Sequence, residues 1–415
     1  MKKIFMSIVG LAAAGTASLH ANELLTTGAD KAWSVEGTLR GFYDDNYTTT
    51  FKKHGSLGFE VSPQISLDMP LEQTEIDARY TYGLYYYQQR EKNGQNPIDQ
   101  SHQFDLWVDH AFNPRLDLTA SDSFRVAQEP ALLAGTGAAA TTERLEGNNI
   151  ANTANLGLRT DWTREFSTTL KYANNYYHYS QSAYSVPLDR VEQSINAEGE
   201  WHWMPTTDLL AGYILSLANY TGDGIVGTNA ITGLPEHSDA RNYVSHTIYA
   251  GLSHEFSEYL KGSAKAGVTY SDYYNESQSS VFPYAKLSLD YTYGPGSYAE
   301  VGFLQTQNAT ETTVPDGSGH LTTSQETSVV YGSINHAITA KLKGSLVGHY
   351  QYSIYNGGLY NNQSASWYSV GLQATYAFNQ HLSANAGYNF DYYTSDVPGL
   401  EYTRNVIFLG VSASF

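Results

Sequence analysis

Side chains with the chemistry of an enzyme are few in this sequence and are poorly spaced. Cysteine is absent, which excludes a thiolate nucleophile, a disulfide and a thiolate metal site. Asp109 and His110 are adjacent in the segment WVDHAF, but adjacent strand residues point to opposite faces and cannot form a compact acid–base pair. The chain has no Gly-x-Ser-x-Gly elbow, no His-x-x-x-His pair and no glycine-rich phosphate loop. We therefore predict no enzyme, no metal site and no cofactor.

The charged side chains fall instead on every second residue of alternating segments. In the segment 341–354, lysine, serine and histidine alternate with leucine, glycine and tyrosine. A period of two is typical of a strand with one polar and one apolar face. If the polar faces line the interior of a closed barrel, the predicted pore-lining charges are Lys261, Lys265, Lys286, Lys341, Lys343, Arg404, Glu192, Glu198, Glu200, Asp105, Asp109 and Asp77.

The predicted lining charges are unevenly distributed along the chain. The N-terminal half is richer in acids and the C-terminal half is richer in lysine. In a cylinder this would set an acidic wall against a basic wall, and such a transverse field favours polar solutes over apolar ones. The alternative is a plugged interior in which the same charges pair across it.

The last segment, RNVIFLGVSASF, indicates which surroundings the apolar faces of the strands contact. Leu409, Val411 and Phe415 lie on one face of a strand that would be a bare edge unless it paired with residues 33–43. Only a closed sheet satisfies every backbone group inside lipid, so this face is predicted to contact acyl chains. A terminal aromatic on an alternating strand resembles the C-terminal signature of bacterial outer-membrane proteins, which implies recognition of these three residues by the barrel-assembly machinery.

The composition and the N-terminal residues agree with a barrel that lies in lipid. Residues 1–21 have two lysines, a short apolar core and small residues before Ala21, which predicts a signal peptide. Residues 22–32 are then a short periplasmic segment and 33–415 the barrel. The chain is acidic, with a formal net charge of −18, which disfavours nucleic acid as a partner. With 35 tyrosines, 15% charged residues and no long apolar run, it is predicted to be a transmembrane β-barrel in lipid of the bacterial outer membrane.

A repeated turn motif sets the number of strands. AFNPRL, EFSTTL, EFSEYL and AFNQHL each place Phe and Leu four residues apart, starting at Phe112, Phe166, Phe256 and Phe378. Short turns are expected near residues 70, 113, 167, 205, 257, 295, 339 and 379, with longer polar connections between them. Short periplasmic turns that alternate with long outer loops indicate an all-β, antiparallel, up-and-down barrel of about 18 strands, within 16–20. Tyrosine clusters such as 82–87 and 174–179 are expected in its outer aromatic girdle.

One long connection, 128–152, is unusually apolar. In general porins the third outer loop folds inward and sets the constriction, and this connection is the third in order. A constriction loop would present Glu129, Glu143, Arg144 and Glu146 as its polar residues. A surface loop is an equally open interpretation.

The segment HQFDLWVDHAFNPRLDLTASDSFRVAQEPALL, residues 102–133, resembles the β-barrel porin 2 group, which is often encoded beside exopolysaccharide genes. The resemblance implies a porin-like channel for passive diffusion of small hydrophilic solutes. One alternative is a glycan- or exopolysaccharide-associated channel, with Tyr85 and Tyr177 as stacking surfaces for sugar rings. The other is a non-transporting surface barrel, an adhesin or structural protein. Porins of this size are often trimers, so a homotrimer is considered, although no interface signal is present.

Overall fold

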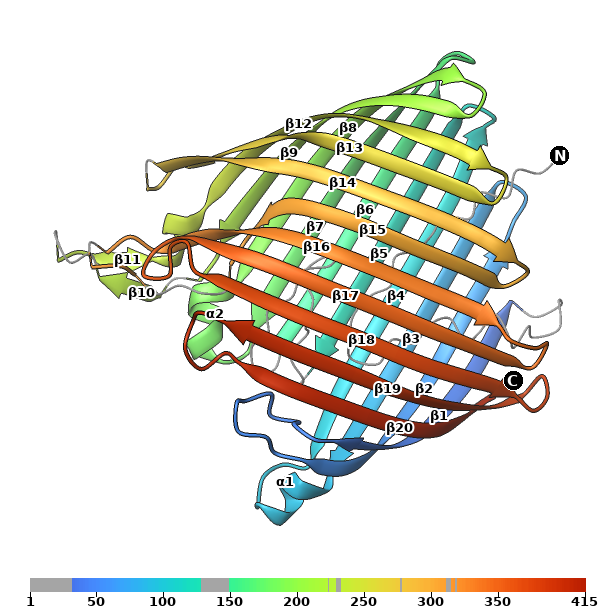
Figure 1. Cartoon of the computed structure of the whole chain (residues 1–415), viewed down its shortest axis with the longest axis horizontal. Helices are drawn as coiled ribbons and strands as arrows, with labels where there is room; N and C mark the ends of the chain where they lie inside the picture. The colour runs from blue at the N-terminus through green and yellow to red at the C-terminus, as the bar shows by residue number, and fades with distance from the viewer. Residues whose placement is uncertain are drawn as a thin grey trace.

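The computed structural model describes residues 32–127, 149–222, 224–228, 233–276, 278–310, 315–317 and 319–415. Eighteen strands form a single antiparallel sheet that closes on itself (Figure 1). A separate two-stranded hairpin, β10–β11, stands outside this ring. No helix among the described residues is long and apolar enough to cross a membrane.

The strands of the ring follow one another in chain order. The first nine are β1 (Trp33–Asp44), β2 (Ser56–Pro70), β3 (Thr74–Tyr87), β4 (Ile98–Asn113), β5 (Leu116–Ala127), β6 (Asn149–Asp161), β7 (Phe166–Tyr179), β8 (Arg190–Met204) and β9 (Thr207–Tyr220). The other nine are β12 (Tyr243–Ser257), β13 (Leu260–Tyr273), β14 (Gln278–Gly294), β15 (Ser297–Asn308), β16 (Thr322–Ala337), β17 (Leu342–Gly357), β18 (Ser364–Ala377), β19 (Leu382–Ser395) and β20 (Tyr402–Ser414).

The ring closes where β1 pairs with β20, in a register that runs from Glu36↔Ser414 to Asp44↔Val406. The predicted partner of the last segment is therefore correct, and the predicted closed barrel of about 18 strands is confirmed. Pairing along this seam satisfies the backbone groups that both edge strands would otherwise expose.

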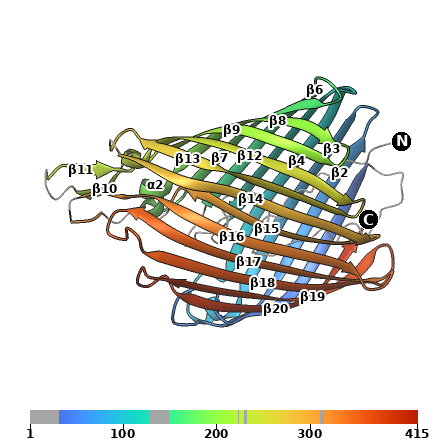
Figure 2. The same cartoon turned by 45° about the horizontal axis from the view of Figure 1, so that its top comes forward.

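Short and long connections alternate around the ring. Eight short connections lie at the end that also holds both ends of the barrel chain, which we call the turn end. The strand ends that the nine other connections join lie at the opposite end, which we call the loop end (Figure 2). Within the described residues, three of these connections contain short elements of their own. These elements are α1 (Gln88–Lys92), α2 (Ser182–Leu188), β10 (Ile225–Thr228), β11 (Pro235–His237) and η2, a 3-10 helix (Ser238–Arg241).

The repeated Phe–Leu motif spans a turn in three of its four copies. Leu116, Leu260 and Leu382 each begin the strand that follows a turn. The copy at Phe166 differs, because Phe166 is itself the first residue of β7 and its turn is the preceding segment 162–165. All four phenylalanines are exposed on the outside of the barrel, so the motif marks a ring of aromatics at the turn end.

Alternation along each strand separates an apolar outside from a polar inside. Leu409, Val411 and Phe415 are 67%, 46% and 62% exposed, whereas the intervening Gly410 and Ser412 are buried. The tyrosine clusters obey the same rule, which corrects the expectation that they all belong to the girdle. Tyr176 is exposed on the outside, but its neighbour Tyr177 is buried on the inside.

Candidate functional site

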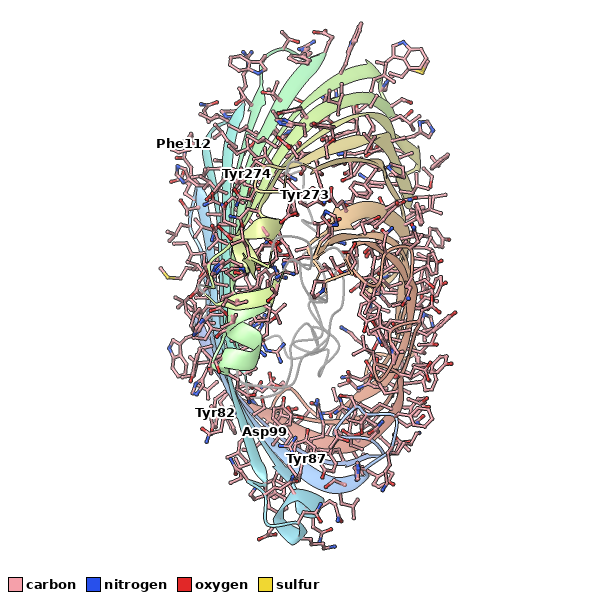
Figure 3. All side chains as sticks on the ribbon, turned by 90° about the vertical axis from the view of Figure 1, so that its left-hand side faces the viewer. Tyr82, Tyr87, Asp99, Phe112, Tyr273 and Tyr274 are labelled. Atoms are coloured by element: carbon pink, nitrogen blue, oxygen red, sulfur yellow. The ribbon has the colours of Figure 1, made fainter. Side chains whose placement is uncertain are left out.

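The interior of the barrel is lined by side chains that project inward from every wall (Figure 3). Near the middle of β13, Lys265 forms an ion pair with Glu198 of β8, although the two residues are 67 positions apart. The Tyr249 hydroxyl on β12 donates to the same carboxylate at 2.7 Å. This tyrosine lies close to the wall because the facing residue on β9 is Gly212, where any Cβ would collide with the ring.

Lys286 of β14 lies directly opposite Lys265 in the strand register. Its side chain is exposed to solvent in the interior, and none of the described carboxylates comes within 4.0 Å of its amine. Two residues further along β14, Tyr284 packs on Tyr249 with ring centroids 5.5 Å apart. We call Glu198, Tyr249, Lys265, Tyr284 and Lys286 the lysine–tyrosine cluster.

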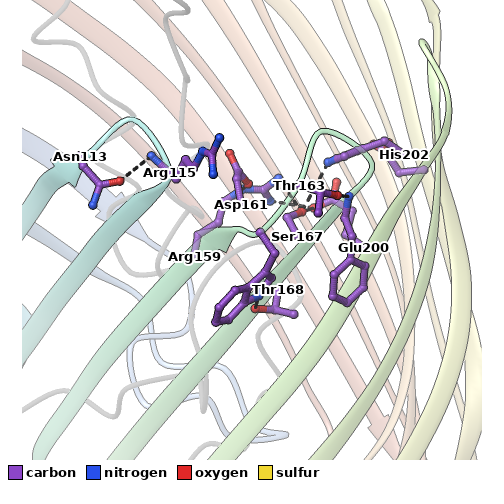
Figure 4. Close-up of polar contacts among 12 residues, drawn as sticks. Asn113, Arg115, Arg159, Asp161, Thr163, Ser167, Thr168, Glu200 and His202 are labelled. Atoms are coloured by element: carbon purple, nitrogen blue, oxygen red, sulfur yellow. Dashed lines mark hydrogen bonds and ion pairs between the residues drawn. The ribbon is translucent and has the colours of Figure 1, made fainter.

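A second group of charges lies near the turn end, on β6 to β9 (Figure 4). Arg159 Nη1 donates to Glu200 at 2.7 Å, and its Nη2 donates to the Ser167 hydroxyl at 3.1 Å. His202 Nδ1 lies 2.7 Å from Asp208 Oδ1, and its Nε2 lies 3.5 Å from Ser167 Oγ. We call these five residues the Arg159 network.

The Arg159 network contains the residue types of a Ser–His–Asp triad, but Ser167 is completely buried and its hydroxyl already contacts Arg159 and Glu200. A nucleophile needs access to substrate. The acids Glu200 and Asp208 with His202 also lie close enough to hold a metal ion. The guanidinium of Arg159, however, already neutralises Glu200, so a cation would have to compete with it. The geometry supports a structural role.

The N-terminal walls carry the other predicted acids. Asp105 is buried on β4, where Gln103 and Ser123 donate hydrogen bonds to it. Asp77 and Asp109 point to the same inner face of the barrel as Asp105 and lie nearer the turn end. His110 lies on the opposite face, where it bonds to Thr74, so Asp109 and His110 are separated as expected.

At the seam, arginines of adjacent strands neutralise two buried acids. Arg40 Nη1 lies 2.9 Å from Glu60, and Arg404 Nε donates to Asp44 at 2.9 Å. These pairs join neighbouring strands along one wall. Glu192 is likewise paired with Arg190 at 2.7 Å, at the loop end of β8.

Three of the predicted lysines lie near the turn end. Lys261 pairs with Glu255 on the adjacent strand, and both are exposed. Lys341 lies in the turn before β17, where its amine donates to the Phe378 carbonyl at 3.2 Å. Lys343 is the second residue of β17. The proposed constriction residues Glu129, Glu143, Arg144 and Glu146 lie outside the described residues.

Other connections fold into the loop end, and sequence analysis did not anticipate them. Figure 3, which looks into the barrel from this end, shows α2 inside the ring of strands. Arg241, at the end of η2, is completely buried; it donates to the Thr310 carbonyl at 2.8 Å and also to the Pro187 carbonyl. Its guanidinium lies 3.9 Å from the centre of the Tyr220 ring. One side chain thus ties together three connections, which we call the Arg241 clamp.

The two tyrosines suggested for sugar stacking occupy different settings. The Tyr85 hydroxyl donates to Glu60 at 3.4 Å, inside the barrel wall. Tyr177 is buried against Leu188 of α2, and the Arg190 guanidinium lies 4.3 Å from its ring centre. Tyr249 and Tyr284, which were not singled out from the sequence, form an aromatic pair beside charged groups in the interior.

Comparison with known proteins agrees with the geometry. The model of the family described as "Putative beta-barrel porin 2" matches residues 237–415, which contain strands β12 to β20. The chain is a porin-like outer-membrane barrel. The match confirms the resemblance to this group, although it lies over the C-terminal strands and not over the segment 102–133 that first suggested it. The turn end of this porin-like barrel is accordingly its periplasmic end.

No curated protein matches the chain in sequence. Among solved structures, the porin-like barrel is similar to OccK1 (OpdK) of Pseudomonas aeruginosa, with 9% identity, 92% of this chain and 99% of that one covered, and a TM-score of 0.45. It is also similar to OccAB3 of Acinetobacter baumannii (10% identity, 92% and 99% covered, TM-score 0.43). A third is the ferric enterobactin receptor PfeA of P. aeruginosa, in complex with enterobactin (11% identity, 92% and 81% covered, TM-score 0.43).

Proposed function

We propose that this barrel is a channel for the passive diffusion of small hydrophilic solutes. The observation that carries the proposal is Lys286, a solvent-exposed residue without an ion pair to any described carboxylate, which faces the interior of a closed ring with an apolar outside. A charge in that position needs water around it, because burying an unpaired ammonium in a dry interior is very costly. Hydrated charges on a pore wall are what a passive channel uses to select solutes.

The positions of the ion pairs also support this function. Arg40–Glu60 and Arg404–Asp44 join adjacent strands, and Arg159–Glu200 joins strands of one wall. A plugged interior would instead pair charges of opposite walls. Lys265–Glu198 spans more strands, but β8, β9, β12 and β13 are consecutive in the ring, so this pair also follows the wall.

The test is single-channel conductance of the refolded mature barrel in a planar bilayer. Stable open steps are expected. Replacing Lys261, Lys265, Lys286 and Lys343 by glutamine together should shift the reversal potential in a salt gradient toward cation selectivity, since four positive charges leave the wall. A folded barrel that never opens would contradict the proposal, and an unchanged reversal potential would remove these residues from the conducting path.

A glycan-associated channel is the second candidate, and one observation favours it. Tyr249 and Tyr284 offer two adjacent rings inside the barrel, and aromatic rings are suitable surfaces for sugar rings. The same bilayer recording with added oligosaccharides separates the two candidates. Steps blocked by an oligosaccharide would favour a glycan channel, whereas unaffected steps would favour general diffusion. A folded barrel without conductance would leave a role at the cell surface.

Two partners belong to this proposal. Leu409, Val411 and Phe415 present an apolar face that is expected to engage the barrel-assembly machinery during insertion and outer-membrane lipid afterwards. A homotrimer remains a prediction by analogy with porins of this size. Cross-linking in native membranes would test it.

A further inference from the structure

The strongest unexplained feature of the interior is a pair of like charges in direct register. Lys265 and Lys286 are cross-strand neighbours on β13 and β14, and both side chains face inward. Like charges directly opposite each other destabilise a sheet. Lys171 of β7 adds a third positive charge that acts on Lys286.

The acids nearby neutralise only part of this charge. Glu198 bonds to Lys265 and accepts the Tyr249 hydroxyl, so its carboxylate is already engaged. The carboxylate of Glu300 on β15 also acts electrostatically on Lys286. The cross-strand partner of Glu300, however, is the acid Asp290, which lies four residues from Lys286 along β14. Within the described ranges, Lys286 has no ion pair, and the residue as a whole is exposed to solvent. The position is therefore suited to an anion.

A preformed aromatic surface lies beside this amine. Tyr284 precedes Lys286 by two residues, so the two side chains lie on the same face of β14, roughly 7 Å apart along the strand. Tyr284 packs on Tyr249 with an interplanar angle of 41°. Glycines at 212 and 267 flank Tyr249 in the register, and a Cβ at either site would collide with it. The wall is thus shaped to hold the two rings.

We propose that the lysine–tyrosine cluster is a binding site for an anionic sugar, with the carboxylate against Lys286 and Lys265 and the sugar ring on Tyr284 and Tyr249. The site rests on the proposed channel function, since a solute reaches it only through the interior. It names the solute class that this channel recognises, a sugar acid. Neutral sugars lack the charge, and simple anions lack the ring.

The test is calorimetric titration of the detergent-solubilised mature barrel with glucuronate, with glucose as the uncharged counterpart. Glucuronate is expected to bind about tenfold more tightly than glucose, the gain of one charge-assisted hydrogen bond. Lys286→Gln should abolish that difference and should fold, because it relieves the repulsion from Lys265. The matched control is Lys343→Gln, an inward-phase lysine of β17 that also has no ion pair with a described residue.

Each arm has an outcome that overturns the proposal. Equal glucuronate affinity in the parent and in Lys286→Gln would overturn it. So would a loss of glucuronate affinity in Lys343→Gln that equals the loss in Lys286→Gln, because both lysines would then act only through the general electrostatic potential of the interior. Tyr284→Leu should weaken glucuronate and leave acetate unchanged; an unchanged glucuronate affinity would reject the sugar-ring contact. Binding is measured without conduction, so glucuronate binding by a non-conducting barrel would reject the channel alone, and conduction without binding would reject the sugar-acid site alone.

Discussion

The backbones of Val35 and Phe415 exchange two hydrogen bonds, from Val35 N to Phe415 O at 3.0 Å and from Phe415 N to Val35 O at 2.9 Å. These bonds join the first strand to the last residue of the chain at the periplasmic end of the seam. Phe415 also stacks on His381, with ring centroids 5.5 Å apart. The terminal residue therefore closes the sheet, in addition to presenting an apolar ring on the outside.

The first prediction concerns this closure. Phe415→Ala removes the stacked ring from the end of β20, and we expect a smaller fraction of folded barrel in the outer membrane. Folded barrel is measured by its altered migration in unheated gel samples. The control is Phe378→Ala, which removes another exposed outer aromatic away from the seam. Equal losses from both variants would show that the effect comes from the girdle and not from closure.

The second prediction concerns the Arg159 network. Arg159→Met leaves the partly buried Glu200 carboxylate without its cation, and we expect a loss of roughly 1–3 kcal/mol of unfolding free energy. Adding Glu200→Gln should recover part of the loss, because contacting partners are not additive. The measurement is urea unfolding in lipid vesicles, followed by tryptophan fluorescence.

The exposed pair Lys261–Glu255 is the matched control for that cycle. Breaking it should change the unfolding free energy by at most about 1 kcal/mol, as for surface ion pairs in general. A loss at Lys261 that equals the loss at Arg159 would contradict a special role for the network.

The alternation of residues predicts most of the architecture because lipid and the interior impose a period of two on every strand. The apolar face of Leu409, Val411 and Phe415 and the inward phase of Lys265 follow from that period alone. Three of the four turn motifs locate a short connection, because the period of two fixes the phase of the strands on both sides of the turn. At Phe166 the motif misplaces the turn, because the pattern fixes the phase of a strand but not its first residue.

The partners of interior charges could not be predicted. The pairing of Lys265 with Glu198 depends on the curvature of the wall between β8 and β13, which no local pattern encodes. The inward position of α2 depends on contacts such as Arg241 to the Pro187 carbonyl, between residues 54 positions apart. A buried arginine in a polar loop gives no periodic signal. The expectation for the tyrosines of 174–179 was wrong for a related reason, since alternation places Tyr176 outside but Tyr177 and Tyr179 inside.

The third prediction concerns the Arg241 clamp. Arg241→Met removes the donors to the Thr310 and Pro187 carbonyls, and we expect the three connections to separate and become more sensitive to protease. Single-channel conductance should rise if these connections narrow the outer entrance. Arg164→Met, in an exposed periplasmic turn, is the control and should change neither measurement. Unchanged cleavage in Arg241→Met would show that the strands alone hold these connections.

The fourth prediction concerns acid stability at the outer end of the seam. Asp45 lies in the connection after β1 and contacts β20, accepting hydrogen bonds from Asn405 N and Nδ2 at 2.7 Å each. Lys53 Nζ lies 2.6 Å from the same carboxylate. Partial burial of Asp45 raises its pKa, but the hydrogen bonds from Lys53 and Asn405 outweigh burial, so the pKa lies below its usual 3.8. Because the folded state favours the ionised form, this group stabilises the barrel above about pH 4 and ceases to do so as the pH falls through its folded pKa.

Asp45→Asn keeps the shape of the side chain and removes its charge. We therefore expect the parent barrel to be more stable than Asp45→Asn at pH 7. The difference should shrink at pH 3, because Asp45 is then largely protonated in the unfolded chain and the folded chain gains less from its ionised form. Urea unfolding in lipid vesicles at the two pH values measures this difference. Glu72→Gln, at an exposed carboxylate in the β2–β3 turn, controls for the loss of one negative charge and should give no such pattern. A stability difference that is the same at pH 7 and pH 3 would show that Asp45 acts by hydrogen bonding alone, and that its charge does not hold the outer end of the seam.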